Sequence, residues 1–198
     1  MIAIFDYGSG NLRSAQRAFE TTGESVVVTS DINKAQNAKG LVIPGVGAFA
    51  ACMEQLIAAG GEELISNRVS SGNAIIGICV GMQVLFSKSN EKGNHRGLKV
   101  FEGSVEKLNS EILPQIGWNT VSSPTESKLF KGVENDSFYF VHSYAAKIDE
   151  VNSINTKATY GEPFLAAVER GNVCATQFHP EKSGKSGLRL IKNWVESI

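Results

Sequence analysis

The first half of the chain alternates short apolar runs with helical patterns, and this alternation most strongly limits how the chain can fold. Four apolar runs are expected to be strands, at residues 2–7, 25–30, 40–45 and 74–79. Helical patterns follow them at residues 11–23, 49–70 and 80–88, with a break in the second at "AAGGEE" and an expected helix end at Gly23. Strands that alternate with helices indicate a parallel sheet with helices on both faces.

The second half has a different pattern, rich in β-forming residues and separated by polar loops. The expected β segments lie at residues 97–108, 136–147, 162–171 and 172–178. The last two flank the turn "RGN" and favour an antiparallel hairpin. A helical pattern closes the chain from residue 183 to 197. We therefore expect a single α/β domain over residues 1–198, with additional antiparallel strands in its second half.

Composition excludes several classes of function. The 198 residues carry a formal net charge of −1, which gives no electrostatic reason to expect nucleic-acid binding. No apolar run approaches the ~20 residues of a membrane helix, and "MIAIFDYG" does not resemble a signal peptide. The three cysteines and three histidines show no metal-ligand spacing, so no metal is expected. These features favour a reducing, cytoplasmic setting without membrane contact.

One junction between an expected strand and helix has a reactive residue in a distinctive place. In "GICVGMQ", Cys79 lies between Gly77 and Gly81. A nucleophile elbow needs this spacing, because the flanking glycines let the side chain project from a tight turn. The amide of Val80 would then face a developing oxyanion. On this stretch alone, a nucleophile and a packed structural thiol are equally compatible with the pattern.

A base for such a nucleophile is present in "QFHPEKSG". His179 follows an expected strand directly, and Glu181 comes two residues later. At a strand end this spacing allows the carboxylate to orient the imidazole. A solvated surface turn is the alternative. The combination of elbow and His-x-Glu in one α/β chain favours a nucleophile, a base and an orienting acid.

Two further glycine-containing segments follow expected strands. "PGVGAF" at 44–49 places Gly45 and Gly47 at the carboxyl end of a parallel strand, where ligands gather in doubly wound sheets. These glycines could turn backbone amides toward a substrate oxygen, or could serve only the loop's own geometry. "YGSGNLR" lacks the third glycine of a dinucleotide fingerprint, because Arg13 occupies its place. No cofactor is expected.

Taken together, six segments resemble the class I, triad-type glutamine amidotransferases, and specifically the branch that serves histidine biosynthesis. The resemblance covers almost the whole chain. Its motifs are "DYGSGNLRSA" (6–15), "LVIPGVGAF" (41–49), "GICVGMQ" (77–83), "IGWN" (116–119), "YFVHSY" (139–144) and "QFHPEKSG" (177–184). It implies a three-layer, flavodoxin-like fold with a parallel and partly mixed sheet.

The resemblance also implies roles for individual residues. Cys79, His179 and Glu181 would be the catalytic triad that hydrolyses L-glutamine. The residues implied for the oxyanion hole are Val80, Val46 and Gly47, with the hole incomplete at rest. The residues implied for binding glutamine are Gly45, Gln83, His142, Ser143 and Tyr144. His142 could instead be a core histidine.

A partner is implied as well, a (β/α)₈-barrel cyclase that receives the ammonia within a heterodimer. The positions implied for that interface are Asn11, Trp118 and Asn119, although Trp118 could equally be buried in the core. Three departures from the usual pattern, Val80, Gln115 and Ala145, leave the triad untouched. Two alternatives stay open: the same glutaminase feeding another synthase, such as a sugar amidotransferase, or a catalytically silent regulatory subunit.

Overall fold

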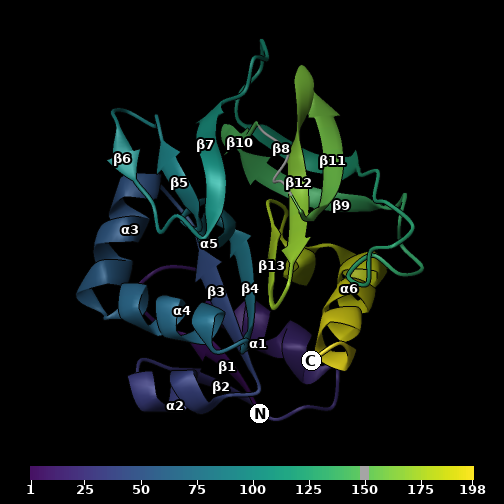
Figure 1. The fold of residues 1–198 in the computed structure, drawn as a ribbon. Helices are drawn as coiled ribbons and strands as arrows, with labels where there is room; N and C mark the ends of the chain where they lie inside the picture. Colours follow the sequence, from purple (N-terminus) through teal and green to yellow (C-terminus); the bar gives the residue numbers. More distant parts are fainter. Residues whose placement is uncertain (148–151) are drawn as a thin grey trace.

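The computed structural model describes residues 1–147 and 152–198, and its centre is a seven-stranded sheet. The sheet order is β11-β12-β13-β4-β3-β1-β2 (Figure 1). Five neighbouring strands are parallel, namely β2 (Val26–Thr29), β1 (Ile2–Phe5), β3 (Gly40–Gly45), β4 (Ala74–Cys79) and β13 (Val173–Thr176). Counting only these five, the order is 2-1-3-4-5, which is the flavodoxin-like order. The expected fold class is confirmed.

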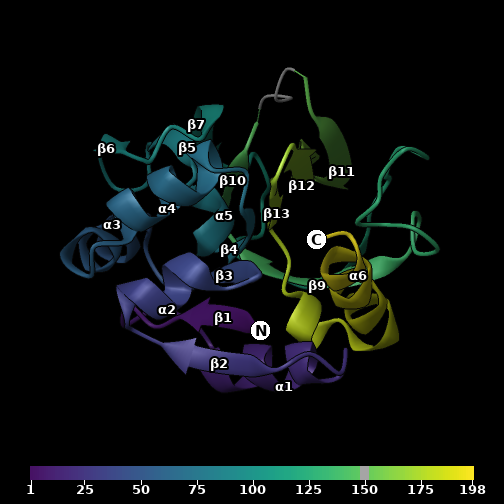
Figure 2. The same ribbon diagram turned by 60° about the horizontal axis from the view of Figure 1, so that its bottom comes forward.

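Helices cover both faces of this sheet and give the three layers seen end-on in Figure 2. On one face lie α2 (Ile32–Asn37), α3 (Phe49–Ala58) and α4 (Gly61–Ser70). On the other lie α1 (Leu12–Glu20) and α6 (Gly184–Glu196), which pack together through an edge-to-face contact of Phe19 with Trp194. Strands β1, β3 and β4 are fully buried, as expected for parallel strands covered on both sides.

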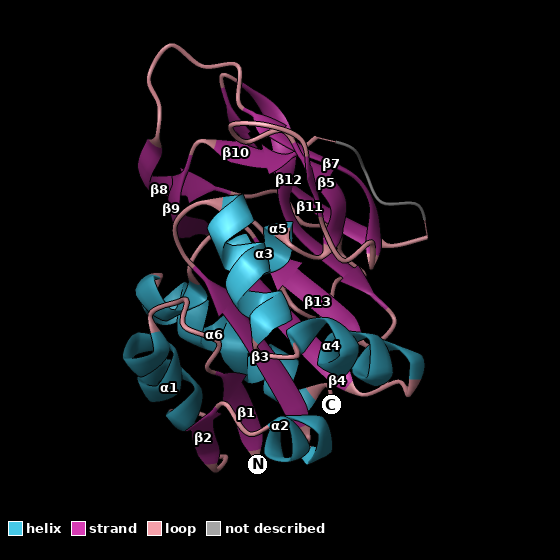
Figure 3. Cartoon of the chain, turned by 90° about the vertical axis from the view of Figure 1, so that its left-hand side faces the viewer, coloured by secondary structure: helices cyan, strands magenta, loops and turns pink. Residues whose placement is uncertain are grey.

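The second half of the chain adds antiparallel structure beyond the carboxyl ends of the parallel strands (Figure 3). Strands β11 (Ile154–Tyr160) and β12 (Glu162–Arg170) form a hairpin that extends the main sheet beside β13. A second sheet contains β5 (Phe86–Ser89), β6 (His95–Arg96), β7 (Phe101–Lys107) and β10 (Tyr144–Ala146). A separate ribbon pairs β8 (Gln115–Thr120) with β9 (Ser137–His142). The predicted hairpin across "RGN" is confirmed by the antiparallel pairing of β12 with β13.

Two local expectations differ from the structure. The helix predicted over residues 80–88 is wrong beyond its first turn, because α5 spans only Val80–Gln83 and Phe86 begins β5. Phe86 is fully buried and pairs with Phe101 of β7, and this tertiary pairing overrides the local helical pattern. The end of α1 comes earlier than predicted, at Thr21, and Gly23 lies in the following turn.

Helix α2 was not predicted, and its position depends on a distant side chain. Asp31 caps its first turn by accepting hydrogen bonds from two backbone amides. Its other end is tied by the fully buried Arg68 of α4, whose guanidinium donates to the carbonyls of Ala35, Gln36 and Ala38. A six-residue helix is too short to be stable alone, so tertiary contacts decide it.

Glycines allow β3, β4 and α5 to approach one another around Cys79. A Cβ on Gly81 would lie 1.9 Å from the carbonyl oxygen of Ile43, and one on Gly45 would lie 2.4 Å from the Gly81 nitrogen. A Cβ on Gly77 would lie 2.5 Å from the Gly81 oxygen. The short helix can therefore pack directly onto the strand ends only with glycine at these positions. No helix among the described residues is long and apolar enough to cross a membrane.

We expect Gly81→Ala to lower the free energy of unfolding by about 3 kcal/mol, because the added carbon forces the backbone of β3 and α5 apart. The matched control is Gly72→Ala, where φ is +72° but no heavy atom lies within 4 Å of the added carbon. That variant should lose only about 1–2 kcal/mol, from backbone strain. Urea unfolding of both variants measures the difference, and equal losses would contradict the packing argument.

Candidate active site

Cys79 occupies a strained turn between β4 and α5. Its backbone angles are φ +57° and ψ −113°, in a region that non-glycine residues rarely adopt. Such strain costs about 1–3 kcal/mol and is held only where the surrounding packing enforces it. Here the enforcing contacts are those of Gly45, Gly77 and Gly81. The Cys79 side chain is buried but lines a pocket, so the elbow expected from the sequence is present.

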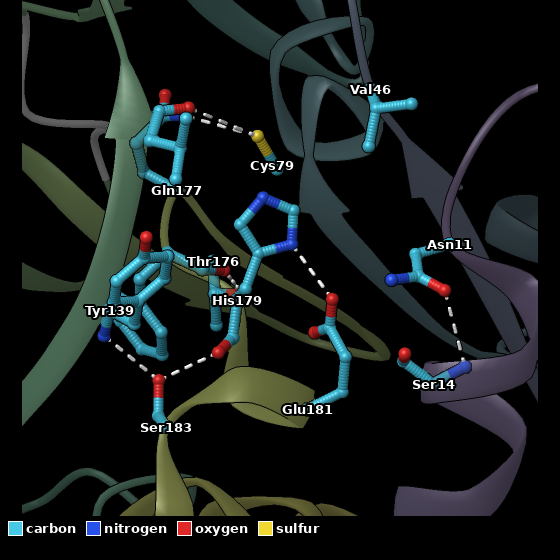
Figure 4. A network of polar contacts seen from close by, with 12 residues as sticks. Asn11, Ser14, Val46, Cys79, Tyr139, Thr176, Gln177, His179, Glu181 and Ser183 are labelled. Carbon is cyan, nitrogen blue, oxygen red and sulfur yellow. Dashed lines mark hydrogen bonds and ion pairs between the residues drawn. The ribbon is translucent and has the colours of Figure 1, made fainter. Parts of the chain in front are cut away.

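His179 lies at the end of β13, with its imidazole between Cys79 and Glu181 (Figure 4). Its Nδ1 is 2.8 Å from the Oε1 of Glu181, and both side chains are almost fully buried. The Ser183 hydroxyl steadies the same segment by donating to the His179 carbonyl at 2.6 Å and accepting from the Tyr139 amide at 2.9 Å. The His179 amide in turn donates to the Tyr139 carbonyl. The turn is therefore rigid rather than a solvated surface loop.

The electrostatics of His179 favour the protonated ring. Burial lowers its pKa, but the interactions with Cys79 and Glu181 outweigh burial and raise the pKa to about 10. A proton on Nδ1 is held by the carboxylate, which leaves Nε2 to face the sulfur. The arrangement can therefore hold an imidazolium next to a cysteine and return its proton to a leaving group.

The pocket in front of Cys79 has a volume of about 480 Å³. Nine of the residues predicted for the site line it: Val46, Gly47, Cys79, Val80, Gln83, His142, Ser143, Tyr144 and His179. Gly45 does not line the pocket, since it packs against α5, and Glu181 lies behind His179. A hollow of about 580 Å³ at the opposite end of the sheet includes Lys39 and Cys174 but none of the predicted residues.

The amide of Val46 does not point to the pocket. The Val46 amide donates a hydrogen bond to the Ser9 hydroxyl at 3.2 Å. The same hydroxyl donates to the Val46 carbonyl oxygen, also at 3.2 Å. Ser9 belongs to the loop after β1 and is not a pocket residue. Gly47 follows with φ +90°. With this peptide orientation, the Val46 amide is committed to Ser9 and unavailable to an oxyanion.

Gln83, at the end of α5, and His142 are further residues of the pocket wall. The Nε2 of Gln83 donates to the Tyr144 carbonyl at 2.9 Å and to the Gln177 Oε1 at 3.0 Å. His142 stacks its ring edgewise on Phe164, and burial lowers its pKa to about 4. Its Nδ1 lies 3.0 Å from the Tyr144 carbonyl oxygen. The ring of His142 is buried against Phe164, as expected of a core histidine, and the residue also lines the pocket.

Sequence reasoning missed Glu91, which also lines the pocket. Its Oε2 accepts a hydrogen bond from the Phe49 amide at 2.7 Å, at the start of α3. Ala48 precedes that helix and has no side chain to cap it, so the cap comes from 42 residues further along the chain. The one sequence signal for this cap was the lack of a capping side chain before Phe49. That signal did not indicate which acidic residue would cap the helix. Lys92 and Lys182 are further pocket residues that were not predicted.

The residues predicted for the partner interface lie in two places. Trp118 is 59% exposed on β8, so its reading as a core residue is wrong, and Ile116 beside it is 63% exposed. Asn119 on the same strand donates to the Thr159 carbonyl at 3.0 Å. Asn11 caps α1 and lies close to Glu181 (Figure 4). Within residues 1–147 and 152–198, no group of three or more His, Cys, Asp or Glu side chains could hold a metal ion.

We expect an NMR pH titration of the histidines to separate His179 from His142. His179 should stay protonated until about pH 10, and His142 should stay neutral down to about pH 4. Because the folded pKa of His179 is raised above 6.5, its contribution to stability is complete below pH 6.5 and disappears as the pH rises through about 10. In Cys79→Ala the pKa of His179 should fall, since the raising interaction with the sulfur is gone. A His179 titration unaffected by that change would contradict the pairing.

Comparison with known proteins identifies the family of the chain. The profile of the family "Glutamine amidotransferase class-I" matches residues 3–198. The chain is 49% identical to the imidazole glycerol phosphate synthase subunit HisH of Streptomyces coelicolor, covering 100% of this chain and 93% of that protein. It is 51% identical to the subunit of the same name from Mycobacterium bovis, covering 100% and 98%.

Solved structures agree on the fold. A crystal structure of a glutamine amidotransferase superposes with a TM-score of 0.79 at 20% identity, covering 98% of this chain and 97% of that one. The structure of PurLQS from Thermotoga maritima gives a TM-score of 0.73 at 20% identity, covering 99% and 97%. With the family profile matched over nearly its whole length, the chain belongs to the class I glutamine amidotransferases.

Proposed function

We propose that this chain is the glutaminase subunit of an imidazole glycerol phosphate synthase, with Cys79, His179 and Glu181 as its catalytic triad. The observation that carries the proposal is the placement of a strained, pocket-lining Cys79 beside an imidazole whose Nδ1 lies 2.8 Å from a buried carboxylate oxygen. The full-length similarity to subunits named HisH supports the assignment to this synthase.

The triad accounts for each proton in glutamine hydrolysis. The Cys79 sulfur attacks the side-chain amide carbon of glutamine while His179 carries the proton that the thiol has lost. The tetrahedral intermediate collapses as His179 gives this proton to the departing nitrogen, which leaves as ammonia and leaves a glutamyl thioester. His179 then accepts a proton from water, whose oxygen attacks the thioester carbon; the carbon–sulfur bond breaks, glutamate is released, and His179 returns the proton to the Cys79 sulfur. Glu181 keeps the ring oriented throughout.

The pocket offers groups for both ends of the amino acid. Glu91 brings a carboxylate to the pocket, where it would attract the α-ammonium group of glutamine. The backbone of Ser143 and Tyr144 would hold the α-carboxylate, and Gln83 supports this wall through its hydrogen bond to the Tyr144 carbonyl. The cavity of about 480 Å³ accommodates a free amino acid of this size.

The oxyanion hole would use the Val80 amide together with an amide of the Val46–Gly47 segment. In the orientation described, Val46 donates to Ser9 instead, so the hole lacks one of its donors. A missing oxyanion-hole donor costs about 10²–10³ in kcat in other hydrolases. The free subunit would therefore waste little glutamine, and a partner that favours the other peptide orientation would activate it.

We expect Ser9→Ala to raise the basal glutaminase rate of the free subunit by about fivefold, because each lost hydrogen bond contributes roughly 0.5–1.5 kcal/mol to the resting orientation. With the partner bound, the active peptide orientation is already favoured, so the stimulated rate should change less than twofold. The ratio of stimulated to basal glutaminase rate should therefore fall. Ser70→Ala is the matched control, since its hydroxyl donates to the Ser66 and Asn67 carbonyls within α4. Equal rates for Ser9→Ala and the unmodified chain, both free and stimulated, would contradict this role.

The acceptor of the ammonia would be a (β/α)₈-barrel cyclase, which converts the ribulosyl carboxamide nucleotide PRFAR to imidazole glycerol phosphate and AICAR. HisH relatives are named as subunits, which supports a heteromeric enzyme. The exposed Trp118 and Ile116 offer apolar area on the β8–β9 ribbon, and an exposed tryptophan suits the centre of an interface. We assign this ribbon surface, with Asn119 on the same strand, and separately Asn11 at the start of α1, to contacts with the cyclase.

The deciding experiment mixes the purified chain with a candidate cyclase and PRFAR and measures glutamate release from glutamine. Stimulated hydrolysis that disappears in Cys79→Ala supports the proposal. If a different synthase, such as a sugar amidotransferase, stimulates hydrolysis instead, that synthase and not the cyclase is the partner. A failure of Cys79 to react with a glutamine-analogue diazo ketone, with no hydrolysis under any condition, would instead indicate a silent regulatory subunit.

A further inference from the structure

The triad carboxylate is only half satisfied. Glu181 Oε1 is 2.8 Å from His179 Nδ1, but Oε2 is buried and has no hydrogen-bond partner among the described residues. A buried carboxylate oxygen without a donor costs at least about 1–3 kcal/mol. Orphaned polar atoms of this kind are rare and call for a physical explanation.

Directly behind the triad lies a narrow space, and its lining limits which donor can reach the carboxylate. The lining residues are Asn11, Ala15, Pro44, Gly45, Val46, Ile78, His179 and Glu181. The space has no room for a water molecule, so the donor has to come from the protein.

Most donors in this lining are already engaged. The Ala15 amide donates to the Asn11 carbonyl at 3.1 Å, the Val46 amide donates to Ser9 at 3.2 Å, and Pro44 has no N–H. Gly45 and Ile78 belong to paired strands in the centre of the sheet. Among the side-chain donors of this lining, the amide nitrogen of Asn11 is the one for which the described residues offer no other hydrogen bond.

Asn11 is oriented for this task by its role as the N-cap of α1. Its Oδ1 accepts from the Ser14 amide at 3.3 Å, so the planar amide must direct its Nδ2 to the other side. Figure 4 shows this nitrogen on the side that faces the Glu181 carboxylate. One side chain thus faces both the helix start and the triad.

We propose that Asn11 is a positioning residue for the triad, whose Nδ2 donates to the Glu181 carboxylate while its Oδ1 caps α1. The proposal rests on the proposed glutaminase function and deepens it. In the resting structure no hydrogen bond joins the two side chains, and small adjustments of their terminal torsions, which are soft, would bring the Asn11 nitrogen onto the carboxylate while His179 keeps its bond. The bond fixes Glu181, which in turn fixes the His179 ring against Cys79.

Two substitutions separate this role from helix capping, because serine and aspartate are as good N-caps as asparagine. Asn11→Ser keeps a cap and removes the donor, and Asn11→Asp also places a second negative charge beside Glu181. In the free subunit, we expect Asn11→Ser to lower kcat for glutamine about tenfold, as for a lost hydrogen bond to a charged group, with KM changed less than about twofold. Asn11→Asp should lose at least as much. The control Asp31→Ser, at the N-cap of α2, should leave both constants unchanged.

A double-mutant cycle with Glu181→Gln tests whether the loss of kcat in Asn11→Ser depends on the Glu181 carboxylate. If Asn11 acts through Glu181, Asn11→Ser should change kcat less than about twofold in the Glu181→Gln background. A loss that is equally large in both backgrounds overturns the proposal and leaves Asn11 as a structural cap. The midpoint of thermal unfolding should stay within a few degrees for Asn11→Ser, as for other exchanges between good caps.

A second measurement needs neither glutamine nor a partner. The rate of Cys79 alkylation by iodoacetamide, followed by mass spectrometry of the free chain, should fall severalfold in Asn11→Ser and remain unchanged in Asp31→Ser. Alkylation and kcat both at the unmodified rate would overturn the proposal. A chain that hydrolyses no glutamine with any synthase would overturn the proposed function instead, while the alkylation comparison would still decide the role of Asn11.

Discussion

The close packing of two strand ends on a one-turn helix is the constraint on which the rest of the site depends. Cys79 can hold a positive φ only because Gly45, Gly77 and Gly81 let β3, β4 and α5 approach to distances that a Cβ would forbid. The backbone strain is confined to this turn, and the packing of the fully buried strands β3 and β4 offsets its free-energy cost. The sulfur is consequently held at the carboxyl edge of the sheet, where β13 brings His179.

The two buried histidines of the pocket have opposite pKa shifts because their surroundings differ. His142 has only burial and a backbone carbonyl, and its pKa is lowered to about 4. His179 is similarly buried, but the sulfur and the carboxylate outweigh burial and raise its pKa to about 10. The first histidine is therefore a neutral part of the wall, and the second favours the protonated form that the proposed mechanism requires. The distinction comes from partners rather than from exposure.

The local sequence pattern predicted much of the fold, and the wrong or missing predictions have a common cause. Strands β3 and β4 begin and end where the apolar runs predicted, because strands buried on both faces are continuous apolar segments. The helix expected through residue 88 ended early because Phe86 pairs with Phe101, a contact between segments that local periodicity cannot register. Helix α2 was missed since its stability comes from Arg68, 30 residues away.

The sequence by itself determined the parallel α/β architecture and brought Cys79, His179 and Glu181 together, because they lie at strand ends whose carboxyl edges must meet at one side of the sheet. Only the tertiary structure decided which groups surround them. It brought Glu91 to the pocket from a polar loop, committed the Val46 amide to Ser9, and placed the Asn11 amide behind Glu181. These contacts depend on the directions of individual hydrogen bonds between distant segments, and periodicity and spacing carry no information about them.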